Sequence, residues 1–260
     1  MDTAFVRALL SHRADPNLPD EEGTAPLTAA LTHHTGRGDQ REMVMLLLEA
    51  KADPGPPLSK LVSKSRLRSV QLAIECRVDL EVRNGEDEDK TLLMSAASVS
   101  LSATRLLLDA RADVNAEGMF GTTPLTIAAA KGNVEICREL LARGARADSG
   151  WSVGWAAHGG SPAVLELLLK ARGDVNSRHP DEGLTPLGYL MHASHATRVP
   201  MLLRLLANSV DLSVVDYRGN EFWSRLVDRV ADPVVPVLRR YWLDRTLPSV
   251  VAGLVEGFLE

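Results

Sequence analysis

Residues Gly121–Asp148 read GTTPLTIAAAKGNVEICRELLARGARAD, and much of the chain repeats the pattern of this segment. It holds two short helical patterns, each followed by a glycine. Thr123 can cap the first helix, Pro124 can take its first position, and Gly132 can end it in a left-handed conformation. The second helix carries apolar residues three and four apart, which places them on one face. One such unit cannot bury that face alone, so the segment requires neighbours of the same kind.

The Thr-Pro-Leu phrase recurs along the chain at multiples of about 31 to 33 residues. The matching positions are Pro26, Leu92, Pro124 and Pro186. A second phrase, a leucine pair followed by a turn with an acidic centre, recurs independently, as in LLSHRADPN, LLDARADVN and LLKARGDVN. Two unrelated phrases with one period indicate a repeat protein, in which stacked units bury one another's apolar faces.

A turn, Thr-Pro-Leu and two helices in this order resemble the ankyrin repeat, a unit of about 33 residues. The resemblance covers roughly residues 1–225. It is strongest at 116–148, where Thr126 replaces the usual histidine, and weakest at 54–79, where only the helix rhythm remains. It implies an all-α solenoid of helix-turn-helix repeats with β-turn or hairpin fingers, closed by a helical C-terminal cap.

The array is predicted to open with a half repeat at 1–17 and to continue with about six repeats. The unit at 149–176 is shortened, and Ser161 and Pro162 are expected to begin its second helix as N-cap and first residue. The last segment, 226–260, leaves the repeat pattern. It is predicted to be either a helical cap over the last repeat or a helix pair that docks a partner.

One departure from the family pattern is systematic. The family places glycine after the second helix, as at Gly144, but the equivalent positions hold cations. These positions are Arg13, Lys51, Arg77, Arg111 and Arg172. A non-glycine residue in a left-handed conformation costs about 1–2 kcal/mol, and a cation at a helix C-terminus returns about 0.3–1 kcal/mol. We therefore interpret these cations as a structural feature rather than a binding patch.

Composition narrows the classes of function. A net charge of −5 weakens the case for nucleic acid, which favours a clustered basic face. Two cysteines, Cys76 and Cys137, lie in leucine-rich helical patterns and are expected to be reduced, which favours the cytoplasm. No stretch of about 18 apolar residues and no signal-peptide pattern is present. We predict a soluble, monomeric, cytoplasmic protein without membrane contact.

No catalytic constellation is apparent in the sequence. His33 with His34 and His192 with His195 are the only close histidine pairs, and a structural zinc site needs about four ligands. A glycine-rich phosphate loop and a nucleophile elbow are both missing. The sequence therefore predicts no enzyme activity, no cofactor and no metal.

The resemblance implies protein–protein interaction on a concave face formed by turn tips and by the first helix of each repeat. Packing does not dictate the residues there, so their identity is informative. The candidate partner-binding residues are Glu21, Glu22, Asp87, Glu88, Met119, Phe120, Trp151, Asp181, Glu182, Tyr217 and Arg218 at turn tips, and His158 and Tyr189 on first helices. Exposed aromatics beside acidic groups favour a basic, partly apolar partner. The alternative is that Met119, Phe120 and Trp151 fold back over neighbouring turns.

Two further hypotheses remain open. The half repeat at the start favours a spacer or regulatory piece of a larger ankyrin array. Asn17, Asn115 and Asn176, each two residues after an aspartate, are similar to the ankyrin turn asparagines that asparaginyl hydroxylases modify. The alternative for these asparagines is that they cap the turn.

Overall fold

The computed structural model describes residues 3–32, 37–83, 89–179, 181–190, 195–208 and 210. Within these ranges the secondary structure is helical, and the only β-pairing is an isolated antiparallel bridge between Arg83 and Thr91. The chain divides into two compact units, residues 1–124 with 142–144 and residues 125–141 with 145–260. The predicted C-terminal cap at 226–260 lies outside the described residues.

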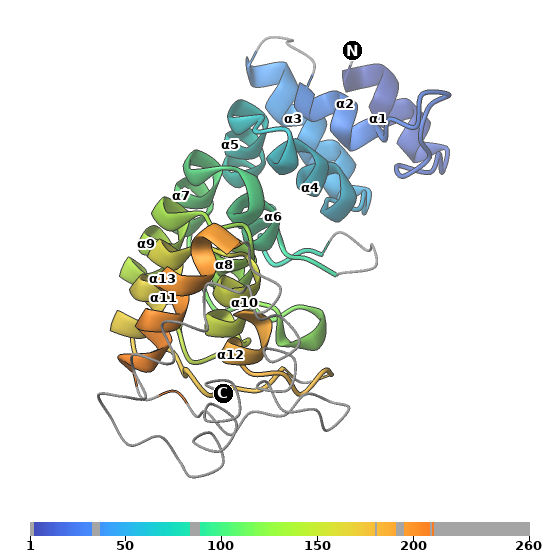
Figure 1. Ribbon diagram of the computed structural model, residues 1–260. Helices are drawn as coiled ribbons and strands as arrows, with labels where there is room; N and C mark the ends of the chain where they lie inside the picture. Colours follow the sequence, from blue (N-terminus) through green and yellow to red (C-terminus); the bar gives the residue numbers. More distant parts are fainter. Residues whose placement is uncertain are drawn as a thin grey trace, which may run out of the picture. The chain divides into compact units, whose positions relative to one another are not determined.

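The first unit consists of successive helix pairs (Figure 1). Its elements are α1 (Thr3–Ser11), α2 (Pro26–Thr32), α3 (Arg37–Glu49), α4 (Gly55–Ser63), α5 (Leu67–Glu75), α6 (Leu92–Val99), α7 (Leu101–Asp109) and the 3-10 turn η1 (Met119–Gly121). First helices contact first helices, α4 touching both α2 and α6, and second helices contact second helices, as α5 does α7. The helix pairs from α2 to α7 therefore bury apolar side chains against one another.

Small residues allow the helices of the first unit to approach closely. In α6, Ala96 and Ala97 are fully buried. Ser100 ends α6 and also caps α7, where its hydroxyl accepts a hydrogen bond from the N–H of Ala103 at 3.2 Å. Thr91 caps the start of α6 in the same way, accepting from the N–H of Met94 at 3.4 Å. Ser100 is therefore the single residue between α6 and α7, and no loop separates these two helices.

The weakly matching stretch 54–79 forms a complete helix pair without a finger. Helix α4 begins at Gly55, directly after the turn that follows α3. The carbonyl oxygen of Arg83 lies where a side chain at Gly55 would be, because an added Cβ would be only 2.0 Å from it. The backbone of the next finger therefore packs against the start of α4, and glycine is required there.

The cations after the second helices adopt the predicted left-handed conformation. Their φ angles lie between 57° and 67° at Arg13, Lys51, Arg77, Arg111 and Arg172. After α7, the N–H of Arg111 donates to Leu108 O at 3.0 Å and the N–H of Ala112 donates to Leu107 O at 3.0 Å. These hydrogen bonds satisfy carbonyl groups that the helix end leaves free.

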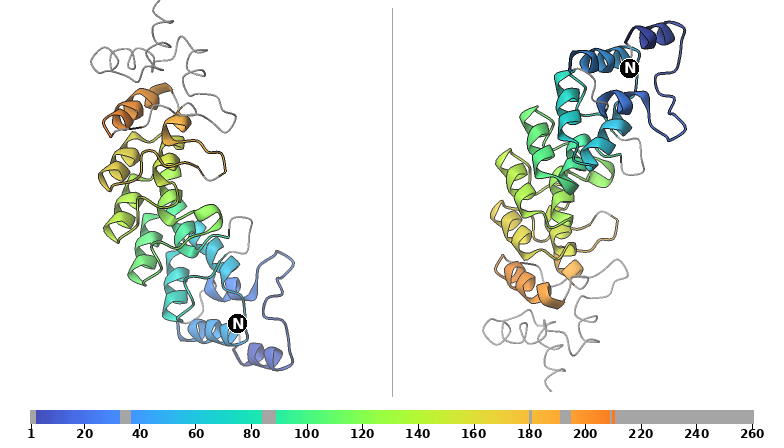
Figure 2. Two further views of the ribbon diagram at one scale, coloured as in Figure 1. Left: turned by 90° about the horizontal axis from the view of Figure 1, so that it is seen from below. Right: turned by 90° about the horizontal axis from the view of Figure 1, so that it is seen from above.

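The second unit repeats the same plan (Figure 2). Its elements are α8 (Pro124–Ala130), α9 (Val134–Ala142), α10 (Ser152–His158), α11 (Pro162–Lys170), α12 (Pro186–Tyr189) and α13 (His195–Leu206). Helix α10 packs on α11 and α12, and α11 packs on α13. The Ser161 hydroxyl accepts from the N–H of Val164 at 3.4 Å, which confirms the predicted cap, and Gly132 ends α8 with a φ of 70°.

Candidate partner-binding surfaces

The finger before α2 holds two predicted site residues at its tip. The backbone N–H of Asp20 donates to Thr24 O at 3.1 Å, and the Asp20 carboxylate accepts the N–H groups of Glu22 and Thr24. This closed turn leaves the side chains of Glu21 and Glu22 exposed. Their carboxylates are free to attract a cation from a partner.

The finger before α8 exposes two apolar side chains. Met119 is 42% exposed and Phe120 is 73% exposed, so neither folds back over a neighbouring turn. Phe120 also has a φ of 57°, a left-handed conformation that costs about 1–2 kcal/mol for a residue with a side chain. Strain of this kind is often retained at sites of function.

Arg83 joins this finger to the preceding one within the first unit. Its guanidinium donates to the backbone carbonyl of Asp89 at 2.9 Å and to the Asp89 carboxylate at 3.1 Å. A second nitrogen donates to Glu117 O at 2.9 Å, one residue before the glycine of the next finger. The predicted residues Asp87 and Glu88 lie outside the described residues, as do Tyr217 and Arg218.

In the second unit, five rings form one aromatic cluster. Its members are Trp151, Trp155, His158, His179 and Tyr189. They come from the start and body of α10, from the finger at 177–185 and from α12. Ring centroids lie between 4.6 and 6.0 Å apart, and most pairs meet edge to face, the arrangement that aromatic quadrupoles favour.

Trp151 is the buried centre of the aromatic cluster, so the fold-back alternative is correct for this residue. Only 6% of its surface is exposed, and its indole N–H donates to Ser177 O at 3.1 Å. The indole lies over Gly154, where an added Cβ would be 1.9 Å from the ring. The shortened turn leaves space that the indole fills. Gly154, three residues after Trp151, is the sequence signal that could have predicted the inward position of the indole.

Tyr189 is likewise buried, at 6% exposure, and does not continue the outward face as expected. Its hydroxyl donates to the carboxylate of Glu182. Burial raises the pKa of the Tyr189 phenol well above its usual range, and the Glu182 carboxylate adds to the effect. Helix α12 turns this side chain inward, toward α10, because the short repeat leaves room between them.

The rim of the aromatic cluster remains accessible. His158 is exposed at the end of α10 and Trp155 is half-buried. Asp181 and Glu182 are exposed on the finger, where their backbone N–H groups donate to Nδ1 of His179 at 3.3 and 3.2 Å. Sequence reasoning missed Trp155 and His179. The four-residue spacing of Trp151 and Trp155, one helical turn, is the signal that could have found the first of them.

In the turns that resemble hydroxylation sites, the capping side chain is that of the aspartate and not that of the asparagine. The backbone N–H of each asparagine donates to the aspartate two residues earlier, at 2.8 Å for Asn17 and 2.9 Å for Asn115 and Asn176. The Asn17 amide oxygen also accepts the N–H of Asp53 at 2.7 Å. This hydrogen bond ties the turn to the corresponding turn of the next repeat.

Two features of the described residues bear on other classes of function. No three histidine, cysteine, aspartate or glutamate side chains in the described part of the chain converge as metal ligands would. None of the helices described is long and apolar enough to span a bilayer.

Comparison with known proteins points to a single repeat type. Residues 58–150 match the family model described as ankyrin repeats (3 copies). The transient receptor potential cation channel subfamily A member 1 homolog of Caenorhabditis elegans is 24% identical over 190 residues, which cover 69% of this chain and 15% of that protein. The nuclear factor NF-kappa-B p105 subunit of Gallus gallus is 28% identical over 193 residues, which cover 70% of this chain and 18% of that protein.

A protein of fowlpox virus (strain NVSL), named as an ankyrin repeat protein, is 28% identical over 151 residues, covering 55% of this chain and 33% of its own length. This chain therefore spans a third or less of each of these relatives. The helix pairs, the hairpin fingers and the left-handed helix ends agree with the family match. Fold and family match together show that the chain carries ankyrin repeats, with residues 58–150 matched as three copies.

Proposed function

We propose that the chain is a non-catalytic protein-binding module whose partner is a basic, partly apolar segment. The observation that carries the proposal is the aromatic cluster, whose accessible rim lies beside exposed carboxylates on one finger. Ankyrin repeats in general are protein–protein interaction modules. The two free thiols at Cys76 and Cys137 favour a reducing compartment such as the cytoplasm.

The rim suits a lysine or arginine side chain. The half-buried face of Trp155 offers a cation–π contact, and His158 extends the platform. Asp181 and Glu182 supply negative charge at the same place, which speeds encounter with a cationic partner. Because Trp151 and Tyr189 lie beneath, the rim is held rigid before binding and less entropy is lost on association.

In the first unit, the finger tip with Met119 and Phe120 supports the same function. Both side chains are exposed, and Phe120 has the aromatic character that is enriched among interface hot spots. This finger can anchor the apolar part of a partner.

The test is proximity labelling with mass spectrometry on the wild type, on Trp155→Ala/His158→Ala and on Phe120→Ala, with Leu203→Ala as control. Leu203 is an exposed apolar residue, at 50%, on the second helix α13. All variants must first show wild-type circular dichroism. Partners that disappear with the first two variants and persist with the control are expected. Partners that persist with all variants would contradict the proposal.

A second candidate function is a spacer or regulatory role within a larger ankyrin array. Helix α1 has no buried residue, and Phe5, Leu9 and Leu18 are 63%, 44% and 68% exposed. An apolar face of this kind suits a further repeat packed against it. Hydrogen exchange on this chain would then show α1 losing protection well before α7, whereas equal protection of the two helices would count against it.

Hydroxylation of the turn asparagines is a lesser candidate. Asn17 and Asn176 are exposed, so an enzyme could reach them once the turn opens. Incubation with an asparaginyl hydroxylase followed by peptide mass spectrometry tests it. A mass gain of one oxygen atom on the peptides of Asn17, Asn115 or Asn176 would support the modification, and unchanged masses would remove it.

A further inference from the structure

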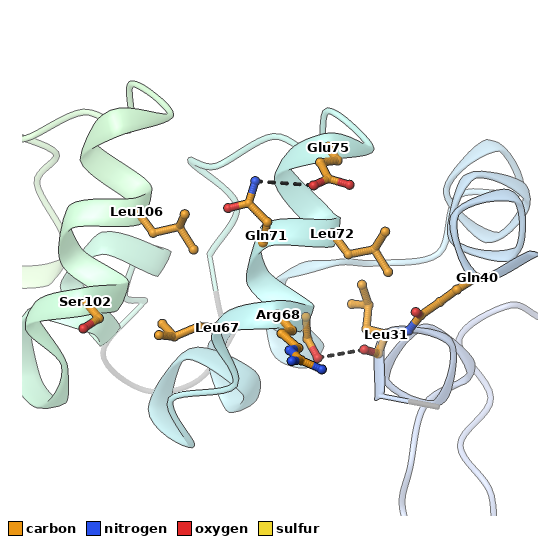
Figure 3. A pocket seen from close by; sticks show the side chains of 10 residues that line it. Leu31, Gln40, Leu67, Arg68, Gln71, Leu72, Glu75, Ser102 and Leu106 are labelled. Atoms are coloured by element: carbon orange, nitrogen blue, oxygen red, sulfur yellow. Dashed lines mark hydrogen bonds between the residues drawn. The ribbon is translucent and has the colours of Figure 1, made fainter. Parts of the chain in front are cut away.

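A groove in the first unit is lined by residues that do not belong to the proposed binding rim of the second unit. It has a volume of about 610 Å³ and is lined by α2, α3, α5 and α7 (Figure 3). Leu67, Leu72 and Leu106 form much of its apolar wall. Leu72 is buried and Leu67 is 36% exposed, so the wall is open to a ligand at the end where α5 begins.

Exposed cations occur along the chain around the start of α5, and one of them, Arg68, lines the groove. Every side chain from Ser63 to Arg68 is exposed. Lys64, Arg66 and Arg68 fall within five residues there, and Lys60 precedes them on α4. Among the described residues, none of these four cations makes an ion pair. The cluster is notable because the whole chain carries a net charge of −5.

Helix ends add to this positive potential. Leu67 and Arg68 belong to the first turn of α5, and Ser102 belongs to the first turn of α7. Neither first turn contains an acidic residue, so no side chain of its own neutralises the partial positive charge at either helix start. Glu75 lies at the far end of the groove, which makes the groove positive at one end and acidic at the other.

We propose that this groove binds an acidic, leucine-containing segment of a partner protein. Apolar side chains of the segment pack on Leu67, Leu72 and Leu106, and its carboxylates pair with Arg66 and Arg68 at the start of α5. The segment is oriented with its acidic end there and away from Glu75, since a carboxylate beside Glu75 would be repelled.

The lining favours a protein segment over other anionic partners. No aromatic side chain lines the groove, so bases of a single-stranded nucleic acid have no stacking platform there. The leucine wall and Arg68 line the same groove, so apolar and acidic side chains of one peptide can be accommodated together. This partner is opposite in charge to the one proposed for the aromatic rim, so the two surfaces can be tested separately.

The experiment is selection of random-sequence peptides by phage display on the whole chain, followed by synthesis of the enriched peptides and measurement of their affinity by fluorescence anisotropy. The variants are Arg66→Glu/Arg68→Glu for the charges and Leu67→Ser for the wall. Glutamate in the first turn of α5 is compatible with the helix dipole, and Leu67 is partly exposed, so folding should be retained. Arg138→Glu, an exposed position on α9, is the matched charge control.

Enriched peptides rich in glutamate or aspartate and leucine are expected. Their affinity should fall about tenfold with Arg66→Glu/Arg68→Glu and also fall with Leu67→Ser, while Arg138→Glu and Trp155→Ala leave it unchanged. Failure to enrich acidic peptides, or acidic peptides that bind all variants equally, would overturn the proposal. So would binding of phosphatidylserine vesicles or single-stranded RNA that depends on the same arginines without any peptide binding. Loss of binding with Trp155→Ala alone would instead assign the peptides to the aromatic rim.

Discussion

At the residue scale, Trp151 is the position where local preference and packing disagree. Its φ of 59° is left-handed, a conformation that is unfavourable for a bulky residue. The indole is nevertheless buried at the centre of the aromatic cluster and donates a hydrogen bond to Ser177 O. Burial of an aromatic side chain of this size stabilises the fold by more than the left-handed backbone costs, which is about 1–2 kcal/mol. Packing therefore determines the conformation of Trp151.

Gly154→Ala tests this arrangement. The added Cβ would lie 1.9 Å from the Trp151 ring, so the ring must move and the aromatic cluster must loosen. We expect a loss of about 1–3 kcal/mol in the free energy of unfolding measured in urea. In a Trp151→Ala background the same change should be neutral or stabilising, because alanine is favoured over glycine in a helix by about 1 kcal/mol. An equal cost in both backgrounds would contradict the ring contact.

The two cysteines should react at different rates. Burial raises the pKa of the Cys137 thiol to about 12, and burial also raises the pKa of Cys76, which is only partly enclosed and is opposed by the charge of Arg41. The thiolate is the reactive form, so a raised pKa means a smaller thiolate fraction at pH 8. A disulfide reagent followed by peptide mapping should label Cys76 first and Cys137 only on unfolding. Faster labelling of Cys137 would show that α9 is less well packed.

At the element scale, helix ends and fingers are positioned by a few side chains. Ser161, Ser100 and Thr91 start helices by accepting backbone N–H groups, and each is readable from the sequence. The relation between fingers is less predictable. Arg83 reaches 34 residues along the chain to Glu117 O, a contact that exists only when neighbouring repeats stack.

Arg83→Ala should therefore loosen two fingers together. Removing hydrogen bonds from a charged group costs about 1.5–3 kcal/mol, and the exposure of Arg83, 39%, lowers the expected loss to about 1 kcal/mol. Hydrogen exchange should speed up both near Asp89 and near Glu117. Arg146→Ala removes a more exposed ion pair, with Asp148, and should change neither finger. Faster exchange in only one finger would mean that Arg83 does not link them.

At the scale of the whole molecule, stability is a sum over neighbouring repeats, so local damage need not unfold the entire chain. The four tryptophans, at positions 151, 155, 223 and 242, fall in the residue range of the second unit, whereas helices occur in both units. Fluorescence and far-ultraviolet circular dichroism thus report on different parts of the molecule.

In Gly154→Ala, the unfolding transition seen by tryptophan fluorescence should move to a lower urea concentration. Part of the helical circular dichroism signal should persist at urea concentrations above that transition. The persisting part comes from α2 to α7, whose packing the substitution does not touch. Coincident transitions by the two probes would show that the units unfold as one. The wild type, measured in parallel, gives the reference separation.

Local propensity and a period that packing imposes on every unit were enough to predict the repeat, its helix pairs, its helix caps and the left-handed cations such as Arg111. The exposed positions of Glu21, Met119 and Phe120 agree with the expectation for turn tips, whereas the fold-back alternative is correct for Trp151. The inward orientation of Trp151 and Tyr189, and their contacts with Trp155 and His179, could not be predicted from the sequence. Their environment depends on how far apart neighbouring repeats lie, and a single repeat carries no information about the space that a shortened neighbour leaves.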